Sequence, residues 1–189
     1  MDRITPADPA QATGKAKELF ASIQTKMGVV PNLFRVLGTA PAALDGYLNF
    51  SAALAAGGFN ARVREQIALT VAESNLCSYC LSAHTYIGGK AGLTAPEIDA
   101  ARHATAAATK TDAILKLARS IVVQRGDLRD EELKRARAEG LTDGDIVETV
   151  ANVALNILTN YVNHVARTVV DFPEVKPGVE GVVAVRANA

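Results

Sequence analysis

The two cysteines of the chain and one of its three histidines occur together in the segment CSYCLSAH, residues 77–84. Cys77 and Cys80 are three positions apart, and His84 follows Cys80 by four positions. On a helix with 3.6 residues per turn these three side chains share one face. Two thiols and an imidazole in such an arrangement are the groups that thiol redox chemistry requires.

A cysteine reacts as the thiolate, which a helix N-terminus and a nearby base both favour. Cys77 lies at the expected start of a helix, and His84 lies one turn beyond Cys80. A second thiol can condense with a sulfenic acid to form a disulfide before oxidation goes further. The spacing therefore predicts one thiol that attacks an oxidant and a partner that resolves the product.

A carboxylate that holds the second nitrogen of the histidine would fix its tautomer and stabilise the imidazolium ion. Glu73 lies four residues before Cys77, and Glu65 lies twelve residues before it on the preceding helix. The geometry of the sequence does not choose between them. Glu73 is expected to be a solvated or helix-terminal acid.

Zinc binding is an alternative use of the same residues, with Glu65, His103 or His164 as a fourth ligand. Structural zinc sites usually take pairs of cysteines or histidines from two separate places in the chain. This chain has a single cysteine pair, and its residues alone leave redox chemistry and zinc binding with similar weight. The family resemblance described below favours redox chemistry, and neither a metal nor a cofactor is then expected. His103, in DAARHATAA, is assigned no role.

Abundant alanine and apolar residues recurring every three or four positions predict an all-α fold. Helices are expected at Pro9–Met27, Pro31–Gly38, Pro41–Ala56, Ala61–Ser74 and near Cys77–Lys90. Asn60 is the expected N-cap of the fourth of these. Thr94 with Glu97 forms a capping box for the next helix, and the charge-dense segment RDEELKRARAE predicts a solvated helix.

The length and charge of the chain indicate a single domain, residues 1–175, with its motif region at 60–100 and a tail at 176–189. Twenty basic residues balance twenty acidic ones, which argues against nucleic acid and anionic membrane as partners. No apolar run long enough for a signal peptide or a membrane span occurs, so a cytoplasmic protein is expected.

Two further patterns each allow two interpretations. GLTAPEI at 92–98 and GLTDGDI at 140–146 indicate either an internal duplication of a helical unit or a common helix joint. In a duplication, Arg125 and Leu128 would match the two cysteines.

A stripe of polar residues on an apolar helix indicates either a polar seam between helices or subunits, or a pocket wall beside Cys80 formed by Asn160, Asn163 and His164. The stripe comprises Glu148, Asn152, Asn156, Asn160 and Asn163.

The pattern Glu65, Cys77-Ser78-Tyr79-Cys80, His84 and Gly92-Leu93-Thr94 resembles the signature of alkylhydroperoxidase D-like proteins in the carboxymuconolactone decarboxylase superfamily. The surrounding helical pattern, from PNLFRVLG to NHVARTVVDFP, resembles the peroxidase-related branch. The resemblance implies a multi-helix bundle that reduces hydroperoxides, with Cys80 as the peroxidatic thiol and Cys77 as the resolving thiol. It also implies a proton relay through Glu65 and His84.

The same resemblance implies a homo-oligomer, a trimer or hexamer, and re-reduction by a dithiol protein of the thioredoxin-like or lipoyl-adaptor type. Tyr79 stands where the best-studied members have a relay histidine, and a tyrosine is a poor base because its usual pKa is about 10. Tyr79 is therefore not expected to serve as the base. It is expected to line the substrate pocket. The alternatives to a peroxidase are a lyase like the carboxymuconolactone decarboxylases, or a zinc-holding or structural oligomer.

Overall fold

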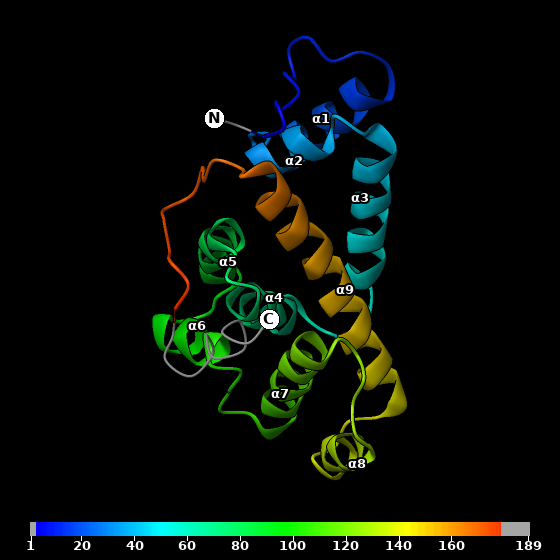
Figure 1. The fold of residues 1–189 in the computed structure, drawn as a ribbon, viewed down its shortest axis with the longest axis vertical. Coiled ribbons are helices and arrows are strands. Elements are labelled where there is room, and N and C mark those ends of the chain that lie inside the picture. The colour runs from blue at the N-terminus through cyan, green and yellow to red at the C-terminus, as the bar shows by residue number, and fades with distance from the viewer. Residues whose placement is uncertain (1–2, 179–189) are drawn as a thin grey trace.

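The computed structural model describes residues 3–178, which form nine α-helices and no strand (Figure 1). The helices are α1 (Gly14–Met27), α2 (Asn32–Leu37), α3 (Pro41–Ala55), α4 (Ala61–Ser74), α5 (Ser78–Lys90), α6 (Ala95–Arg102), α7 (Thr109–Gln124), α8 (Asp130–Ala138) and α9 (Asp143–Ala166). The all-α prediction is confirmed. The predicted tail at 176–189 lies almost entirely outside the described residues.

Helix α4 is the centre of the bundle and packs against α5, α6, α7 and α9. All of its residues from Gln66 to Glu73 are buried, since neighbours surround it on every side. Helix α9 runs diagonally along the length of the molecule, with α1–α3 gathered at one end and α8 at the other (Figure 1). The two helices that contact most of the bundle, α4 and α9, also flank the helix that carries the cysteines, α5.

The helix boundaries follow the capping residues of the sequence. The Asn60 side chain accepts a hydrogen bond from the amide of Val63 at 3.1 Å and begins α4 as predicted. Thr94 and Glu97 form the predicted capping box. The first helix starts at Gly14 rather than Pro9, because Asp8 holds the preceding residues in a turn by accepting a hydrogen bond from the amide of Ala10.

The two Gly-Leu-Thr joints have the same local structure. Gly92 and Gly140 adopt φ values of 90° and 94°, and the threonine of each joint caps the next helix with a capping box. A left-handed conformation of this kind closes a helix and costs glycine little. The likeness of the two segments is therefore explained as a shared joint, and a duplication of the whole unit stays a prediction.

The C-terminal segment after α9 is tied to the body of the protein by a buried carboxylate. Glu73, at 0% exposure, pairs with Arg102 of α6 at 2.9 Å and accepts a hydrogen bond from the amide of Gly178 at 2.6 Å. Glu73 lies at the end of α4 as one of the two expectations had it, but it is buried, so the expectation of a solvated acid was wrong. Arg102 also donates a hydrogen bond to the carbonyl of Lys176. Helix α4, helix α6 and the segment around residue 175 therefore enclose the Glu73 carboxylate.

We predict that Arg102→Ala lowers the free energy of unfolding by about 3 kcal/mol, because it leaves a buried carboxylate without its cation. The melting temperature should fall by roughly 6 to 12 °C in a thermal unfolding experiment. Lys15→Ala, which breaks an exposed pair with Asp45, is the matched control and should change stability little. An Arg102→Ala protein as stable as the control would contradict this account of Glu73.

Candidate active site

The turn between α4 and α5 places Cys77 at the N-cap of α5 and Cys80 in its first turn. Leu76, in the left-handed conformation with φ 56°, ends α4, and the amide of Cys77 then donates to the carbonyl of Ala72 at 2.9 Å. This closes α4 in the manner of a Schellman motif and fixes the direction in which α5 starts. Both cysteines are free, and each is only 2% exposed.

The two buried thiols are chemically different because one donates a hydrogen bond to the other. The hydrogen bond from Cys77 lowers the pKa of Cys80 to about 7, although burial opposes the shift. The positive charge of His84 and the nearby side-chain amides of Asn163 and Asn160 add to the lowering. The hydrogen bond to Cys80 and burial raise the pKa of Cys77. Cys80 is therefore the thiolate of the pair, and Cys77 keeps its proton.

His84 is held by Glu65, the carboxylate one helix away. The His84 Nδ1 lies 2.8 Å from the Glu65 Oε2, which leaves Nε2 as the nitrogen free to act on another group. Burial favours the neutral ring, but the charges of Glu65 and Cys80 outweigh it and raise the pKa of His84. The structure thus brings Glu65, His84 and Cys80 together, while Glu73 is occupied with Arg102. A thiolate beside an imidazolium is the result.

The polar stripe of α9 has two parts with different partners. At one end, Glu148 accepts hydrogen bonds from the amides of Gly58 and Phe59, both at 2.9 Å, so this part is a seam between helices. At the other end, Asn163 Nδ2 donates to the Cys80 sulfur at 3.2 Å. Asn160 is oriented by a hydrogen bond of 2.9 Å from Asn75 Nδ2 to its Oδ1. The structure thus places a polar seam and a wall of the thiol site on one helix.

Tyr79 and His164, two further predicted pocket residues, line a cavity of about 260 Å³ that also contains Cys77 and Asn163. The Tyr79 hydroxyl accepts a hydrogen bond from the amide of Leu33 at 3.1 Å, at the start of α2. Burial raises the pKa of this hydroxyl, and the Asp171 carboxylate adds to the effect. The His164 Nε2 lies 2.9 Å from the carbonyl of Asn75, at the end of α4.

Two residues near the thiols were missed by the sequence analysis. Tyr47 of α3 has a pKa raised to about 12 by burial and by the charges of Cys80 and Glu65, so it stays protonated beside the site. Asn75 follows the last residue of α4, and it is within hydrogen-bonding distance of both Asn160 and His164. No spacing in the sequence links residue 47 to residue 80. Asn75 lies two residues before Cys77, and this proximity was the one available signal.

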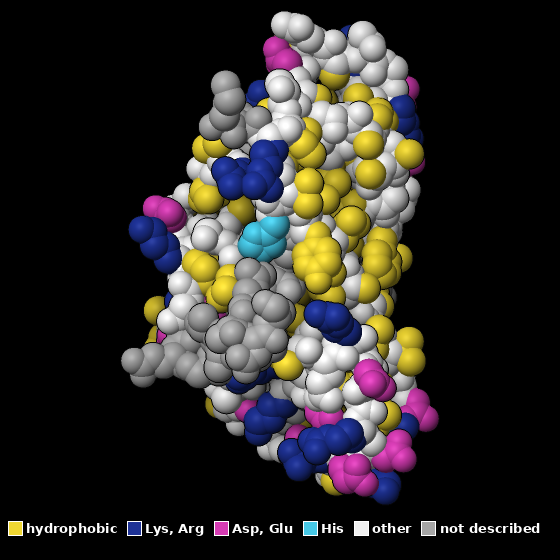
Figure 2. All heavy atoms as spheres, viewed as in Figure 1, with side chains coloured by type: hydrophobic (Ala, Val, Ile, Leu, Met, Phe, Trp, Pro, Cys, Tyr) yellow, Lys and Arg dark blue, Asp and Glu magenta, His cyan; other side chains and the backbone are white. Residues whose placement is uncertain are grey.

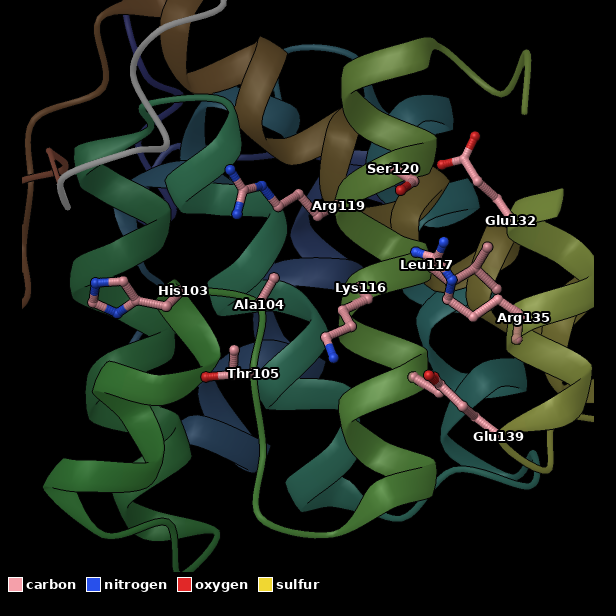
Figure 3. A pocket seen from close by; sticks show the side chains of 12 residues that line it. His103, Ala104, Thr105, Lys116, Leu117, Arg119, Ser120, Glu132, Arg135 and Glu139 are labelled. Atoms are coloured by element: carbon pink, nitrogen blue, oxygen red, sulfur yellow. The ribbon is translucent and has the colours of Figure 1, made fainter. Parts of the chain in front are cut away.

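A different cavity, of about 360 Å³, lies between the α6–α7 loop, α7 and α8 (Figure 3). His103 is on its wall, together with Lys116, Arg135, Glu132 and Glu139. Figure 3 shows charges of both signs around it, and none of its described lining residues is a cysteine. The cavity has no part in the thiol chemistry.

Comparison with known proteins agrees with the geometry of the site. Residues 41–122, which span α3 to most of α7, match the sequence model of the Carboxymuconolactone decarboxylase family. The chain is similar in structure to an uncharacterised peroxidase-related protein with an alkylhydroperoxidase AhpD core from Ralstonia eutropha JMP134, with a TM-score of 0.78 and 23% identity. That match covers 90% of this chain and 92% of the other. The chain has an AhpD-like fold.

Other solved structures show the same AhpD-like fold. A peroxidase-related protein from Silicibacter sp. TM1040 has a TM-score of 0.74 at 22% identity, over 86% of this chain and 87% of that one. The debrominase Bmp8, solved as a variant in complex with 2,3,4-tribromopyrrole, has a TM-score of 0.75 at 17% identity, over 89% and 91%. No curated protein matches the sequence significantly.

The described part of the bundle offers neither a metal site nor a membrane-spanning helix. Within residues 3–178, no group of three or more His, Cys, Asp and Glu side chains is arranged to hold a metal ion. Across the same residues, no helix combines the length and the apolar character needed to cross a membrane.

We predict that Glu65→Gln shifts the pH profile of Cys80 alkylation by iodoacetamide to higher pH. The wild-type rate should rise through pH about 7, the pKa of Cys80. Removing the Glu65 charge destabilises the His84 imidazolium, which in turn destabilises the thiolate, so alkylation at pH 7 should slow by about threefold or more.

Glu73→Gln is the control for this measurement, since Glu73 faces Arg102 and not His84. Its alkylation profile should match the wild type even where its stability does not. If Glu73→Gln shifts the profile and Glu65→Gln leaves it in place, Glu65 is not the orienting acid.

Proposed function

We propose that the chain is a thiol-dependent peroxidase that reduces hydroperoxides to alcohols by cycling Cys80 and Cys77 between dithiol and disulfide. The observation that carries the proposal is the division of roles within the pair. Cys80 is a buried thiolate that receives hydrogen bonds from Cys77 and Asn163, and it lies one turn from the His84–Glu65 pair. A nucleophile, a proton donor and a resolving thiol thus occupy one site.

In the first step the Cys80 thiolate attacks the outer oxygen of a hydroperoxide and the O–O bond breaks. The departing alkoxide takes the proton of the His84 imidazolium and leaves as the alcohol, while Cys80 becomes a sulfenic acid. Glu65 keeps the Nδ1 proton in place and stabilises the charged ring before the transfer. In the second step Cys77 attacks the sulfenic sulfur, the S–S bond forms, and hydroxide leaves with the Cys77 proton as water.

Two buried polar atoms beside Cys80 support an oxygen substrate. Asn160 Nδ2 and Asn163 Oδ1 have no hydrogen-bond partner among the described residues. Buried donors and acceptors normally have partners, so an open donor and an open acceptor at one place suit a ligand that offers both. A hydroperoxide does, because its O–H donates and its oxygens accept. We assign Asn160 and Asn163 to peroxide binding, with Tyr79 and His164 at the edge of the pocket.

The cycle requires a reductant, because each turnover leaves a disulfide in the protein. A dithiol protein of the thioredoxin-like or lipoyl-adaptor type would supply two electrons and two protons. A pair that must be re-reduced at every turnover also fits the reducing cytoplasm.

We further propose that the chain is a homo-oligomer, in line with its resemblance to oligomeric proteins. The face of α9 opposite to the asparagines is apolar and exposed, and Figure 2 shows hydrophobic side chains gathered along α9 and α3. Its exposed members are Val147, Val150, Leu158, Tyr161 and Val165. Together with Ala154, which is also exposed, they recur every three or four residues, which is the pattern of a helix that packs against another helix. A trimer or hexamer would bury this face.

The AhpD-like fold also includes the debrominase Bmp8, so the reaction must be tested and not only the fold. A thiolate with a proton donor and a resolving thiol also suits reductive removal of a halogen. A lyase of the carboxymuconolactone decarboxylase type would have no use for the dithiol. Release of bromide from 2,3,4-tribromopyrrole, or turnover of a ring lactone that survives loss of both cysteines, would favour these alternatives over the peroxidase.

We predict that Cys80→Ser abolishes hydroperoxide consumption, whereas Cys77→Ser consumes about one equivalent and then stalls, because attack needs one thiolate and recycling needs two. Mass spectrometry of Cys77→Ser after one equivalent of cumene hydroperoxide should find sulfenic or sulfinic acid on Cys80. Consumption by Cys80→Ser, with the oxygen adduct on Cys77, would reverse the two roles.

For the oligomer, we predict that the double change Tyr161→Glu and Val165→Glu produces a protein with the mass of a single chain in light scattering after size-exclusion chromatography. The six or more carboxylates that a trimer or hexamer would then bury are too costly to hold at an interface. Val123→Glu, on the exposed side of α7, is the control and should leave the assembly unchanged. A wild-type monomer would contradict the proposal.

A further inference from the structure

The cavity of about 260 Å³ near the C-terminal end of α9 gives access to one sulfur of the pair and not to the other. Cys77 lines it together with Leu76, Ser78, Tyr79, Asn163, His164, Arg167, Thr168 and Val170, whereas Cys80 is not among the residues on its wall. Cys80 accepts the hydrogen bond from Asn163 and lies near His84, which Glu65 holds. In the oxidised protein, a reagent that enters this cavity would therefore meet the Cys77 end of the disulfide.

The described wall of this cavity carries one cation, Arg167. Arg167 is exposed and forms the C-cap of α9 in the left-handed conformation, with φ 53°. Its guanidinium makes no ion pair within residues 3–178. His164 lies beside it, and none of the nine described lining residues is acidic. Figure 2 shows Lys or Arg side chains and a histidine over this end of α9, with no acidic side chain between them.

We propose that this mouth, formed by Cys77, Ser78, His164 and Arg167, is the docking surface of the reductant, and that the reductant is an anionic dithiol that attacks the Cys77 sulfur. The inference rests on the proposed function for its disulfide, and it adds which sulfur is attacked and which charge the partner carries. Arg167 provides the charge that attracts the partner, and Ser78, at the start of α5, borders the attacked sulfur.

The chemistry of the leaving group points to the same sulfur. A partner thiolate attacks the Cys77 sulfur, the S–S bond breaks, and Cys80 leaves as the thiolate. A thiol of lower pKa leaves faster, and the charge of His84 and the Asn163 and Asn160 amides, which remain in place when Cys77 is bonded to another sulfur, lower the pKa of Cys80. The second thiol of the partner then attacks the mixed disulfide, and Cys77 departs and takes a proton. Two electrons pass from the dithiol to the chain, and the partner becomes the disulfide.

The mouth of the cavity stays exposed to solvent in an oligomer that buries the apolar face of α9, because the two lie on different sides of this helix. Successive residues on a helix are about 100° apart, so Arg167 lies roughly 160° around the axis from Val165. His164 lies on the flank between the two faces. Assembly through Tyr161 and Val165 and docking at the mouth are therefore compatible.

The first experiment locates the attack. Full-length protein is oxidised to the Cys77–Cys80 disulfide with diamide, mixed briefly with excess N-acetylcysteine, an anionic monothiol, and quenched in acid. Tandem mass spectrometry of the peptic peptide that contains both cysteines then shows which of them carries the adduct. We expect the adduct on Cys77 and a free thiol at Cys80. An adduct on Cys80, an even division between the two, or a disulfide that N-acetylcysteine does not open would overturn the proposal.

The second experiment tests the charge of the partner. The rate at which dihydrolipoate, an anion, reduces the disulfide is compared with the rate for neutral dihydrolipoamide. Arg167→Gln should lower the ratio of the two rates by about threefold or more, because the cation at the mouth is lost. Lys134→Gln, an exposed cation on α8 at the far end of the molecule, should leave the ratio unchanged (Figure 1). A ratio that Arg167→Gln does not alter would overturn the assignment of an anionic partner.

The two proposals fail in different ways. The disulfide in these experiments is made with diamide. The experiments therefore test the docking surface even if the protein reduces no hydroperoxide. Absence of hydroperoxide consumption with an adduct on Cys77 would remove the peroxidase and keep the docking surface. Peroxidase activity with an adduct on Cys80 would keep the peroxidase and remove the docking surface.

Discussion

A negative charge on a sulfur atom that is 2% exposed is the feature on which the rest of the site depends. Burial alone would hold Cys80 as the neutral thiol, since a charge loses its hydration inside a protein. Four groups reverse this outcome: the Cys77 thiol, the His84 imidazolium and the Asn163 and Asn160 amides. They come from the start of α5, from its next turn and from α9. The bundle has to bring those elements together before the thiolate exists.

The same requirement explains why two chemically identical side chains have different roles. Cys77 is the N-cap of α5 and donates its proton to the shared hydrogen bond, so its own pKa rises as that of Cys80 falls. The inner sulfur becomes the nucleophile and later the leaving group. The outer sulfur lines the cavity at the end of α9, where a partner can reach it. Attack on the peroxide and attack by the reducing partner thereby take place at different sulfurs of one disulfide.

Much of this arrangement could be predicted from local sequence. The helix of Ala61–Ser74 and the capping box of Thr94 and Glu97 are encoded by neighbouring residues, and they were predicted correctly. Glu65 and His84 were paired through a family resemblance, and the structure places them 2.8 Å apart. The proximity of Tyr47 to Cys80 could not be predicted, because it depends on how α3 packs against the bundle.

Glu73 shows the limit of a local interpretation most clearly. A glutamate one residue from the end of a helix normally faces solvent, and the sequence around it contains no sign of burial. Its partners, Arg102 and the amide of Gly178, lie 29 and 105 residues away in the chain. Long-range contacts of this kind follow from the path of the C-terminal segment, which no short motif encodes.

The most direct test of the account is the stoichiometry of one oxidation. Fully reduced protein is mixed with one equivalent of cumene hydroperoxide, and free thiols, alcohol product and the state of both cysteines are measured together. The account predicts that both thiols disappear, that one equivalent of alcohol is formed, and that dithiothreitol restores both thiols from a Cys77–Cys80 disulfide. Unchanged thiols beside unreacted hydroperoxide, or the loss of a single thiol to sulfinic acid at Cys80, would contradict it.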